Sequence, residues 1–247
     1  MKGIILSGGA GTRLRPLTRV TSKQLLPIYN QPMIFYPLSK LLNAGIKDIL
    51  IIVSPDHCGD YMKLLGSGKE FGTKFTYEIQ DKPEGIAQAF LIAKDFLADG
   101  DDVTLILGDN IIEDDVTQVI KNFKRGATIF AKEVPDPERF GVVSFDTNKK
   151  ATKIVEKPKE FLSNFAVIGL YIYDKRVVDV AANLKPSVRG ELEITDLNNW
   201  YLQQHELIVE PLQKEWIDAG TFESFYRANE LAYKKSKEGR PLGWKKV

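Results

Sequence analysis

The stretch GIILSGGAGTRLRPLT, residues 3–18, joins a short apolar run to a glycine-rich turn with cations behind it. Residues 3–6 have the length of a buried strand, and three glycines follow within four positions. Arg13, Arg15 and Lys23 come directly after them. Bare backbone amides together with guanidinium and ammonium groups are the donors that a polyphosphate requires. The pattern therefore predicts a phosphate-binding loop at the end of the first strand.

Two familiar glycine loops do not fit this stretch. A dinucleotide-binding loop needs G-x-G-x-x-G, but counting from Gly9 gives GAGTRL, with Leu14 where the third glycine would allow close helix packing. A Walker A loop needs the run Gly-Lys-Ser/Thr to begin five residues after its first glycine, and Gly8 leads instead to Arg13. A turn that binds no ligand stays open as the alternative at this point.

Length and composition describe an ordinary globular chain. Its 247 residues, 43% hydrophobic and 27% charged, suffice for one α/β domain or two small ones. The net charge of +1 provides no basic excess for nucleic acid or an anionic membrane. Cys58 is the single cysteine, which excludes an intrachain disulfide and argues against a structural zinc site. Without a signal peptide or an apolar run near the roughly 18 residues of a membrane span, we expect a cytoplasmic protein.

Apolar runs of strand length alternate with segments of helical period in the first half of the chain. The expected strands are 3–6, 48–53, 74–80 and 103–109, and the expected helices are 33–44, 60–66, 86–98 and 116–124. Pro37 must lie in the first turn of its helix. Strands separated by crossover helices predict an α/β fold with a mostly parallel, twisted sheet and helices on both faces.

The second half is more mixed and richer in β segments. The expected strands there are 127–134, 141–145, 151–156 and 164–173, and the expected helices lie near 175–183, 193–204 and 221–237. Thr221 is suited to cap the last helix. We therefore expect one α/β domain with substrate-binding β segments inserted in its second half.

Two motifs together indicate a family. GGAGTRLRPLT (8–18) followed by SKQLLPI (22–28) resembles the sugar-1-phosphate nucleotidyltransferases, and the pair Lys23 and Gln24 favours their glucose-1-phosphate thymidylyltransferase branch. The resemblance continues along nearly the whole chain. It implies a Rossmann-like nucleotidyltransferase fold as a single domain over 1–247. The implied nucleotide-binding part is about 1–125, the sugar-phosphate-binding part about 126–225, and the C-terminal helix about 221–237.

The resemblance implies a Mg²⁺ site made by Asp109 in ILGDN and Asp218 in EWIDAGT. Asp109 comes directly at the end of an expected buried strand. This position supports a ligand-binding role, because ligands of open α/β sheets bind beyond the carboxyl ends of the strands. A capping or turn aspartate is the alternative for each. Ile217 and Ala219 stand where the family has leucine and threonine around the second aspartate. Two carboxylates with phosphate oxygens and water suit octahedral Mg²⁺.

The resemblance also implies two sets of substrate-binding residues. On sequence grounds alone, Glu156, Lys157 and Arg189 would be ordinary surface charges. The implied nucleotide-binding set is Leu6, Gly8, Gly9, Gly11, Thr12, Arg13, Lys23, Gln24, Gln80, Pro83, Gly85 and Asp109. The implied sugar-phosphate-binding set is Asn110, Gly141, Glu156, Lys157, Val167 and Arg189.

The implied reaction is nucleotidyl transfer from dTTP to α-D-glucose 1-phosphate, giving dTDP-glucose and pyrophosphate by direct attack on the α-phosphorus. The implied catalytic residues are Arg13, Lys23, Asp109, Lys157 and Asp218. UTP or another sugar 1-phosphate as substrate is the first alternative, a non-catalytic sensor of these ligands the second, and a dinucleotide-dependent oxidoreductase the third. The chain resembles the short form of the family, and the resemblance implies a homo-oligomer.

Overall fold

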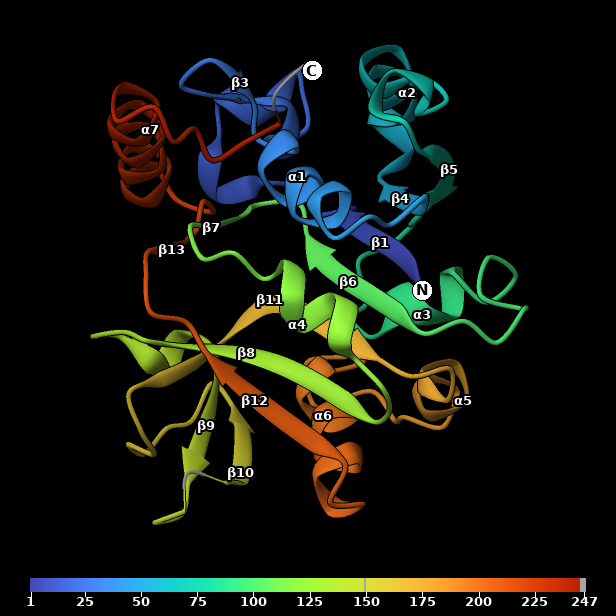
Figure 1. Cartoon of the computed structure of the whole chain (residues 1–247), viewed down its shortest axis with the longest axis vertical. Coiled ribbons are helices and arrows are strands. Elements are labelled where there is room, and N and C mark those ends of the chain that lie inside the picture. Colours follow the sequence, from blue (N-terminus) through green and yellow to red (C-terminus); the bar gives the residue numbers. More distant parts are fainter. Residues whose placement is uncertain (149, 245–247) are drawn as a thin grey trace. The chain divides into compact units, whose positions relative to one another are not determined.

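The fold was analysed in a computed structural model that describes residues 1–148 and 150–244 (Figure 1). By contacts, the chain forms two compact units whose segments alternate along the sequence. The glycine-loop unit comprises residues 2–82, 106–121 and 214–247, and the β-rich unit comprises Met1 with residues 83–105 and 122–213. The predicted division into a nucleotide-binding and a sugar-phosphate-binding part stays a prediction.

The glycine-loop unit is built on a parallel sheet. Strands β1 (Lys2–Ser7), β4 (Asp48–Val53) and β5 (Lys74–Ile79) pair in parallel, with Ile5 opposite Ile51. β4 is buried along five of its six residues, as its unalternating apolar run predicts for a strand covered on both faces. Helices α1 (Phe35–Asn43) and α2 (Cys58–Leu65) form the crossovers, and Pro37 lies in the first turn of α1, as expected. The predicted α/β class is confirmed.

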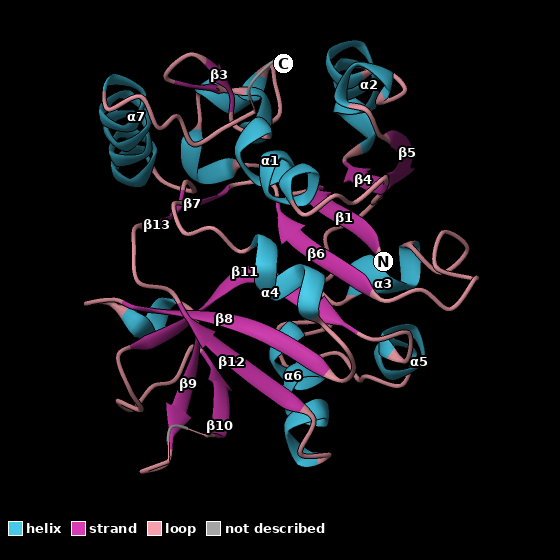
Figure 2. Ribbon diagram, in the orientation of Figure 1, coloured by secondary structure: helices cyan, strands magenta, loops and turns pink. Residues whose placement is uncertain are grey.

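Short elements complete this unit (Figure 2). They are the 3₁₀ turns Thr12–Leu14, Leu17–Arg19, Lys23–Leu25, Pro55–His57 and Lys69–Phe71, the strands β2 (Pro27–Ile28) and β3 (Gln31–Pro32), and the helix α4 (Thr117–Asn122), whose last residue already belongs to the β-rich unit. Strand β6 (Val103–Leu107) carries the chain from the β-rich unit into the glycine-loop unit. The sequence did not predict the antiparallel pair β7 (Asn110–Ile112) and β13 (Trp216–Asp218).

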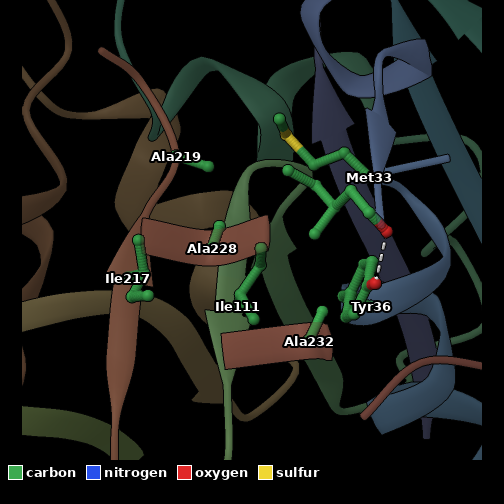
Figure 3. Packing of buried hydrophobic residues seen from close by; sticks show 8 residues of the cluster. Met33, Tyr36, Ile111, Ile217, Ala219, Ala228 and Ala232 are labelled. Carbon is green, nitrogen blue, oxygen red and sulfur yellow. Dashed lines mark hydrogen bonds between the residues drawn. The ribbon is translucent and has the colours of Figure 1, made fainter. Parts of the chain in front are cut away.

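Helix α7 (Phe222–Lys237) packs along β7 and β13 (Figure 3). Its first turn is a capping box, in which Thr221 accepts a hydrogen bond from the Ser224 amide and Ser224 accepts one from the Thr221 amide. The cap predicted at Thr221 is therefore confirmed. Small buried residues let α7 approach the core closely: Ala228 and Ala232 pack with Met33, Tyr36, Ile111 and Ile217.

The β-rich unit is a mostly antiparallel sheet with three helices. Its strands are β8 (Ala127–Glu133), β9 (Gly141–Phe145), β10 (Ala151–Glu156), β11 (Phe165–Tyr173) and β12 (Leu207–Pro211). β11 pairs antiparallel with β8 and β9, β9 with β10, and β12 is parallel to β8. The helices are α3 (Gln88–Ile92), α5 (Val177–Ala182) and α6 (Ile194–Gln203). Strand β12 was not predicted.

The long helix predicted over 86–98 is wrong, because α3 ends at Ile92. Beyond Ile92 the backbone hydrogen bonds no longer follow one helical pattern. The Leu97 amide donates to the Ala93 carbonyl four residues back, but the Ala98 amide donates to the Asp95 carbonyl only three residues back. The apolar spacing is still correct for burial, since Phe90 and Leu97 both lie in the core. Turns bury these positions as well as a continuous helix would.

A buried carboxylate, that of Asp174, links three segments of the β-rich unit through hydrogen bonds. Asp174, 5% exposed, accepts hydrogen bonds from the Gly126 amide (2.9 Å), the Tyr201 hydroxyl (3.0 Å) and the Arg176 guanidinium. Burial alone would raise the pKa of Asp174, but these donors hold the pKa below its usual value. Because every donor comes from a different element or turn, the carboxylate ties the start of β8 to the end of β11 and to α6.

We expect Gly126→Ala to destabilise the protein strongly and Gly100→Ala only mildly. Both glycines have a left-handed backbone, with φ of 81° and 73°, which costs an alanine about 1–2 kcal/mol. A Cβ at Gly126 would also lie 2.2 Å from the Glu206 carbonyl oxygen, whereas at Gly100 the nearest atom is 3.6 Å away. Thermal melts of the two variants measure the difference. Equal losses in Tm would mean that backbone conformation alone determines the cost.

Candidate active site

The glycine loop follows β1 and is shaped by two close approaches. A Cβ at Gly8 would lie 2.0 Å from the Gln80 side-chain oxygen, so only glycine fits beside that residue. Gly11 has φ 59°, and its carbonyl accepts a hydrogen bond from the Thr18 hydroxyl (2.7 Å). The loop therefore lies against Gln80 at the end of β5.

The 3₁₀ turn after the loop separates an apolar side chain from a cation. Leu14 is fully buried, so the position that lacks a third glycine contributes to the core instead. Arg13 is exposed, and its guanidinium lies beside Gly220. A Cβ at Gly220 would be 2.7 Å from the Arg13 Nη2 and 3.1 Å from an Asp218 carboxylate oxygen. Arg13 and Asp218 therefore face the same small space.

Lys23, Asp109 and Asp218 form a buried charged cluster. The Lys23 ammonium donates to Asp109 Oδ2, and both side chains are nearly buried. The pairing of β7 with β13 sets Asp218 opposite Asn110, and the Ala219 amide donates to the Asp109 carbonyl (3.0 Å). This register brings the two aspartates together although 108 residues of chain lie between them.

The two carboxyls of the cluster have pKa values shifted in opposite directions. Burial would raise the pKa of Asp109, but the Lys23 ammonium holds it below its usual value. Burial and then the charge of Asp109 raise the pKa of Asp218 to about 7, against the opposing effects of Lys23 and Arg13. Two adjacent buried carboxyls cannot both ionise freely, so the pair holds about one proton until the pH rises through about 7.

A hydrogen-bond chain orients Asp109 from behind. The Trp216 indole N–H donates to the Asn110 side-chain oxygen (2.7 Å), and the Asn110 amide nitrogen donates to Asp109 Oδ1 (3.1 Å). Lys23 then takes the other oxygen, Oδ2. The Asn110 side chain thus contacts Asp109 and Trp216, and its predicted role toward the sugar phosphate stays a prediction. Sequence reasoning missed Trp216 as a site residue.

A second buried network supports Gln24. Its side-chain oxygen accepts from the Ser22 hydroxyl (2.7 Å) and from the Tyr61 hydroxyl (3.3 Å), and all three residues are less than 5% exposed. Burial raises the pKa of Tyr61 to about 12, so the hydroxyl stays a donor. Nothing in the sequence near Tyr61 could have identified it, because its partners lie 37 and 39 residues away.

The β-rich unit gathers a separate charged cluster. The Arg189 guanidinium binds Glu193 (2.8 Å), Glu191 (3.2 Å) and Glu156 (3.4 Å). The Thr195 hydroxyl donates to the other Glu156 oxygen (2.7 Å). Of these three carboxylates, Glu193 makes the shortest contact with Arg189.

Lys157 stands in this cluster on a strained backbone. Its φ is 43°, a left-handed value that is rare outside glycine, and its amide donates to the Phe140 carbonyl (2.9 Å). Gly141 pairs with Glu156 in register, and a Cβ there would lie 3.0 Å from the Thr195 hydroxyl and 3.9 Å from Val167. The structure thus brings five of the predicted sugar-phosphate residues together.

Gly85 is required by packing within the β-rich unit. Its φ is 106°, and a Cβ would lie 2.3 Å from the Leu192 carbonyl oxygen. Leu192 also donates to the Glu84 carbonyl (2.7 Å). These contacts hold residues 84–85 against the segment that follows Arg189.

The predicted residues divide between the two units. Those in the glycine-loop unit are Leu6, Gly8, Gly9, Gly11, Thr12, Arg13, Lys23, Gln24, Gln80, Asp109, Asn110 and Asp218. Those in the β-rich unit are Pro83, Gly85, Gly141, Glu156, Lys157, Val167 and Arg189.

A cavity of 740 Å³ in the glycine-loop unit is lined by none of these predicted residues. Its wall includes Lys40, Glu113, Lys235 and the Trp244 ring, which packs 4.6 Å from the Phe71 ring. Lys235 pairs with Glu113 across this wall (2.7 Å). Burial lowers the pKa of Lys40 to about 8.

Residues 2–235 match the nucleotidyl transferase family. The chain belongs to that family. It is 52% identical to the glucose-1-phosphate thymidylyltransferase of Neisseria meningitidis, an alignment that covers 92% of this chain and 81% of the relative. It is 48% identical to the Mycolicibacterium smegmatis enzyme of the same name, covering 94% and 82%. The predicted resemblance and the prediction of a nucleotidyltransferase enzyme are confirmed.

Solved structures agree with this placement. A Bacillus anthracis protein assigned as a glucose-1-phosphate thymidylyltransferase, solved in complex with sucrose, matches with a TM-score of 0.89 and 50% identity, over 94% of this chain and 95% of that one. A UDP-glucose pyrophosphorylase complexed with UDP-glucose matches with a TM-score of 0.83 and 25% identity, over 95% and 98%. Among the described residues, no helix has the length and apolar character needed to span a membrane.

We expect Asp218→Asn to raise the Tm of the metal-free protein more at pH 8 than at pH 5. A carboxyl whose pKa rises from about 4 to about 7 on folding favours folding while protonated. That contribution is lost as the pH increases through 7, whereas asparagine stays neutral. We expect a gain of several degrees at pH 8, on the order of 2–4 °C for each kcal/mol. A pH-independent difference between variant and wild type would contradict the shared proton.

Proposed function

We propose that this chain transfers a thymidylyl group from dTTP to α-D-glucose 1-phosphate and releases pyrophosphate. The observation that carries the proposal is the buried pair Asp109 and Asp218, with Lys23 and Arg13 beside it and the glycine loop adjacent. Relatives named glucose-1-phosphate thymidylyltransferase, at about half identity, support the choice of substrates.

The proposed chemistry needs positioning and charge compensation more than acid–base catalysis. An oxygen of the sugar phosphate attacks the α-phosphorus in line, the new P–O bond forms, and the bond to the β-phosphate oxygen breaks. The nucleophile is already anionic at neutral pH, so no strong base or covalent enzyme intermediate is required. What the protein must supply is cations that offset the repulsion between two phosphate groups.

Residues of the glycine-loop unit are suited to the triphosphate. Amides of the loop and the exposed Arg13 guanidinium would hold the leaving pyrophosphate. Burial would lower the pKa of Lys23, but the carboxylate of Asp109 and then that of Asp218 hold it above its usual value, so the ammonium would stay charged and offset the charge that develops at the α-phosphate. Gln80, which lies against Gly8, would contact a pyrimidine edge through its side-chain amide.

Asp109 and Asp218 would hold Mg²⁺, and their chemistry fits a hard divalent cation. Two buried carboxyls that share a proton near neutral pH gain most from a cation that lets both ionise. Among residues 1–148 and 150–244, no group of three or more His, Cys, Asp or Glu side chains is arranged to hold a metal, so phosphate oxygens and water would complete the shell. When bound, the ion supplies charge neutralisation at the phosphate oxygens.

Residues of the β-rich unit are suited to the sugar phosphate. Lys157 and Arg189 offer cations for the phosphate, and Glu156 offers an acceptor for sugar hydroxyls. Arg189 already contacts three carboxylates, which fix the direction of its guanidinium before any ligand arrives. Fixed donors of this kind reduce the reorganisation that substrate binding requires.

UTP is the second candidate nucleotide, because a structural neighbour was solved with UDP-glucose. Thymine and uracil differ by one methyl group, which is worth about 0.8 kcal/mol, or roughly fourfold in affinity. We further propose a homo-oligomer in the cytoplasm, where nucleoside triphosphates are made.

The direct test is pyrophosphate release from a matrix of dTTP and the four common NTPs against several sugar 1-phosphates, with Mg²⁺. We expect dTTP with glucose 1-phosphate to give the highest kcat/KM. Binding of both ligands without pyrophosphate release would instead identify a sensor, and preference for another pair would change the assigned substrates.

Arg13→Ala should lower kcat/KM for dTTP by about 10²–10³, the usual loss for one donor to a developing anion. Arg15→Ala is the matched control, since it removes an exposed arginine two residues further on. Steady-state pyrophosphate release measures both, with circular dichroism to confirm folding. Near-wild-type turnover of folded Arg13→Ala, or an equal loss in Arg15→Ala, would contradict the leaving-group role.

A further inference from the structure

Gln24 is almost completely buried, yet only one end of its side-chain amide has a partner. The residue is 3% exposed, and its side-chain oxygen accepts from the hydroxyls of Ser22 and Tyr61. Its side-chain nitrogen makes no hydrogen bond to the part of the chain that the structure describes. A buried polar group without a partner costs free energy, so such groups are rare. At a candidate active site, an unpaired donor indicates that a ligand supplies the acceptor.

The distances in this network show which end of the Gln24 amide faces inward. Ser22 Oγ lies 2.7 Å from the Gln24 side-chain oxygen, which is the usual separation for O–H···O and short for N–H···O. Tyr61 Oη lies 2.8 Å from Ser22 Oγ and 3.3 Å from the same Gln24 oxygen. The Tyr61 proton can therefore go to Ser22 while the Ser22 proton goes to Gln24. In such a chain each hydrogen bond polarises and strengthens the next.

Ser22 does not make the hydrogen bond that is usual for its position. It is the N-cap of the 3₁₀ turn Lys23–Leu25, where a serine side chain normally accepts from a backbone amide of the first turn. Here it makes no such capping bond, and its hydroxyl contacts Gln24 and Tyr61 instead. The turn therefore forms without the Ser22 hydroxyl, which is left to orient Gln24.

Tyr61 reaches this network from helix α2, and the core does not need its hydroxyl. The residue is fully buried, and phenylalanine would fill the same space without a polar group to satisfy. Burial raises the pKa of Tyr61 to about 12, so the hydroxyl keeps its proton throughout the neutral range. A buried hydroxyl that packing does not require points to a role in orienting its neighbours.

The Gln24 side chain lies beside the residue that precedes Asp109. A Cβ at Gly108 would be 2.9 Å from Gln24 Cγ. The Gly108 amide donates to the Leu6 carbonyl (2.9 Å), near the end of β1 and just ahead of the glycine loop. In the same turn as Gln24, the Lys23 ammonium binds Asp109. One short turn thus brings Lys23 and Gln24 to segments that the nucleotide is proposed to contact.

We propose that Tyr61 is a positioning residue for nucleotide binding: through Ser22, its hydroxyl holds the Gln24 oxygen inward, so that the Gln24 amide nitrogen donates to an oxygen of the nucleoside triphosphate. Without the hydroxyl chain the amide would be free to turn over and present its oxygen, which repels an acceptor. A donor that is fixed before the ligand arrives loses little freedom on binding. The inference rests on the proposed nucleotidyl transfer and adds Tyr61, a residue outside the predicted site.

The first test compares Tyr61→Phe with Tyr36→Phe. Tyr36 is the matched control, because it is also buried in the glycine-loop unit but its hydroxyl donates to the Ile28 carbonyl (2.6 Å). Each variant loses one buried hydroxyl, so both should lower the Tm. Only Tyr61→Phe should weaken dTTP binding, by roughly three- to tenfold, the usual contribution of one hydrogen bond.

Isothermal titration calorimetry with dTTP and Mg²⁺ measures the affinities, and the KM for glucose 1-phosphate should stay unchanged in both variants. A Tyr61→Phe protein that binds dTTP as tightly as wild type overturns the proposal. An equal loss of affinity in Tyr36→Phe also overturns it, because the effect would then follow from lost stability.

A double-mutant cycle tests whether Tyr61 acts through Gln24. Gln24→Met removes the amide, keeps a side chain of similar length, and should weaken dTTP binding at least as much as Tyr61→Phe. In that background, adding Tyr61→Phe should change the Kd less than twofold, because no amide is left to orient. Additive losses of affinity overturn the proposal.

Pyrophosphate release from the same samples separates this inference from the proposed reaction. A wild type that binds dTTP, with the expected loss in Tyr61→Phe, but releases no pyrophosphate contradicts the reaction and supports the role of Tyr61. A wild type that releases pyrophosphate, with unchanged dTTP affinity in Tyr61→Phe, contradicts the role of Tyr61 alone. A wild type that does not bind dTTP contradicts both.

Discussion

The repulsion between two buried carboxyls is the constraint on which the glycine-loop unit depends. Asp109 and Asp218 come from distant segments, and the β7–β13 register, the Trp216–Asn110 hydrogen bonds and Lys23 all act to hold them together. The cost appears in the pKa of Asp218, which is raised to about 7. Such an arrangement is unfavourable for stability, and functional sites are where proteins maintain it. The glycine loop and the Arg13 guanidinium lie beside this pair and add hydrogen-bond donors suited to an anion.

The β-rich unit also holds several carboxylates close to its cations. Around Arg189 three carboxylates face one guanidinium, with the Lys157 ammonium close to Glu156. The three acids keep the guanidinium oriented. Lys157 is held in a left-handed conformation, which fixes where its chain leaves β10. Both units therefore rely on pre-arranged charges, which suits a reaction dominated by positioning.

Sequence alone predicted features that depend on neighbouring residues. The buried strand 48–53, the Thr221 cap and the glycine loop each follow from a few consecutive residues. Pairs that form across the chain were missed: β7 with β13, Trp216 with Asn110, and Tyr61 with Gln24. The helix expected over 86–98 failed because apolar spacing records burial and cannot distinguish a helix from a series of turns. The roles of Glu156 and Arg189 came from family resemblance, since isolated surface charges carry no local signal.

The central claim is that Asp109 and Asp218 form a cation site that is strained without its ion. The most direct measurement is the ionisation of Asp218, followed by carboxyl ¹³C NMR across a pH titration with and without saturating Mg²⁺ and dTTP. The account predicts a midpoint near pH 7 in the metal-free protein and one below about pH 5 when the ion is bound. A midpoint that does not move with Mg²⁺, or that lies near 4 in both states, would contradict it.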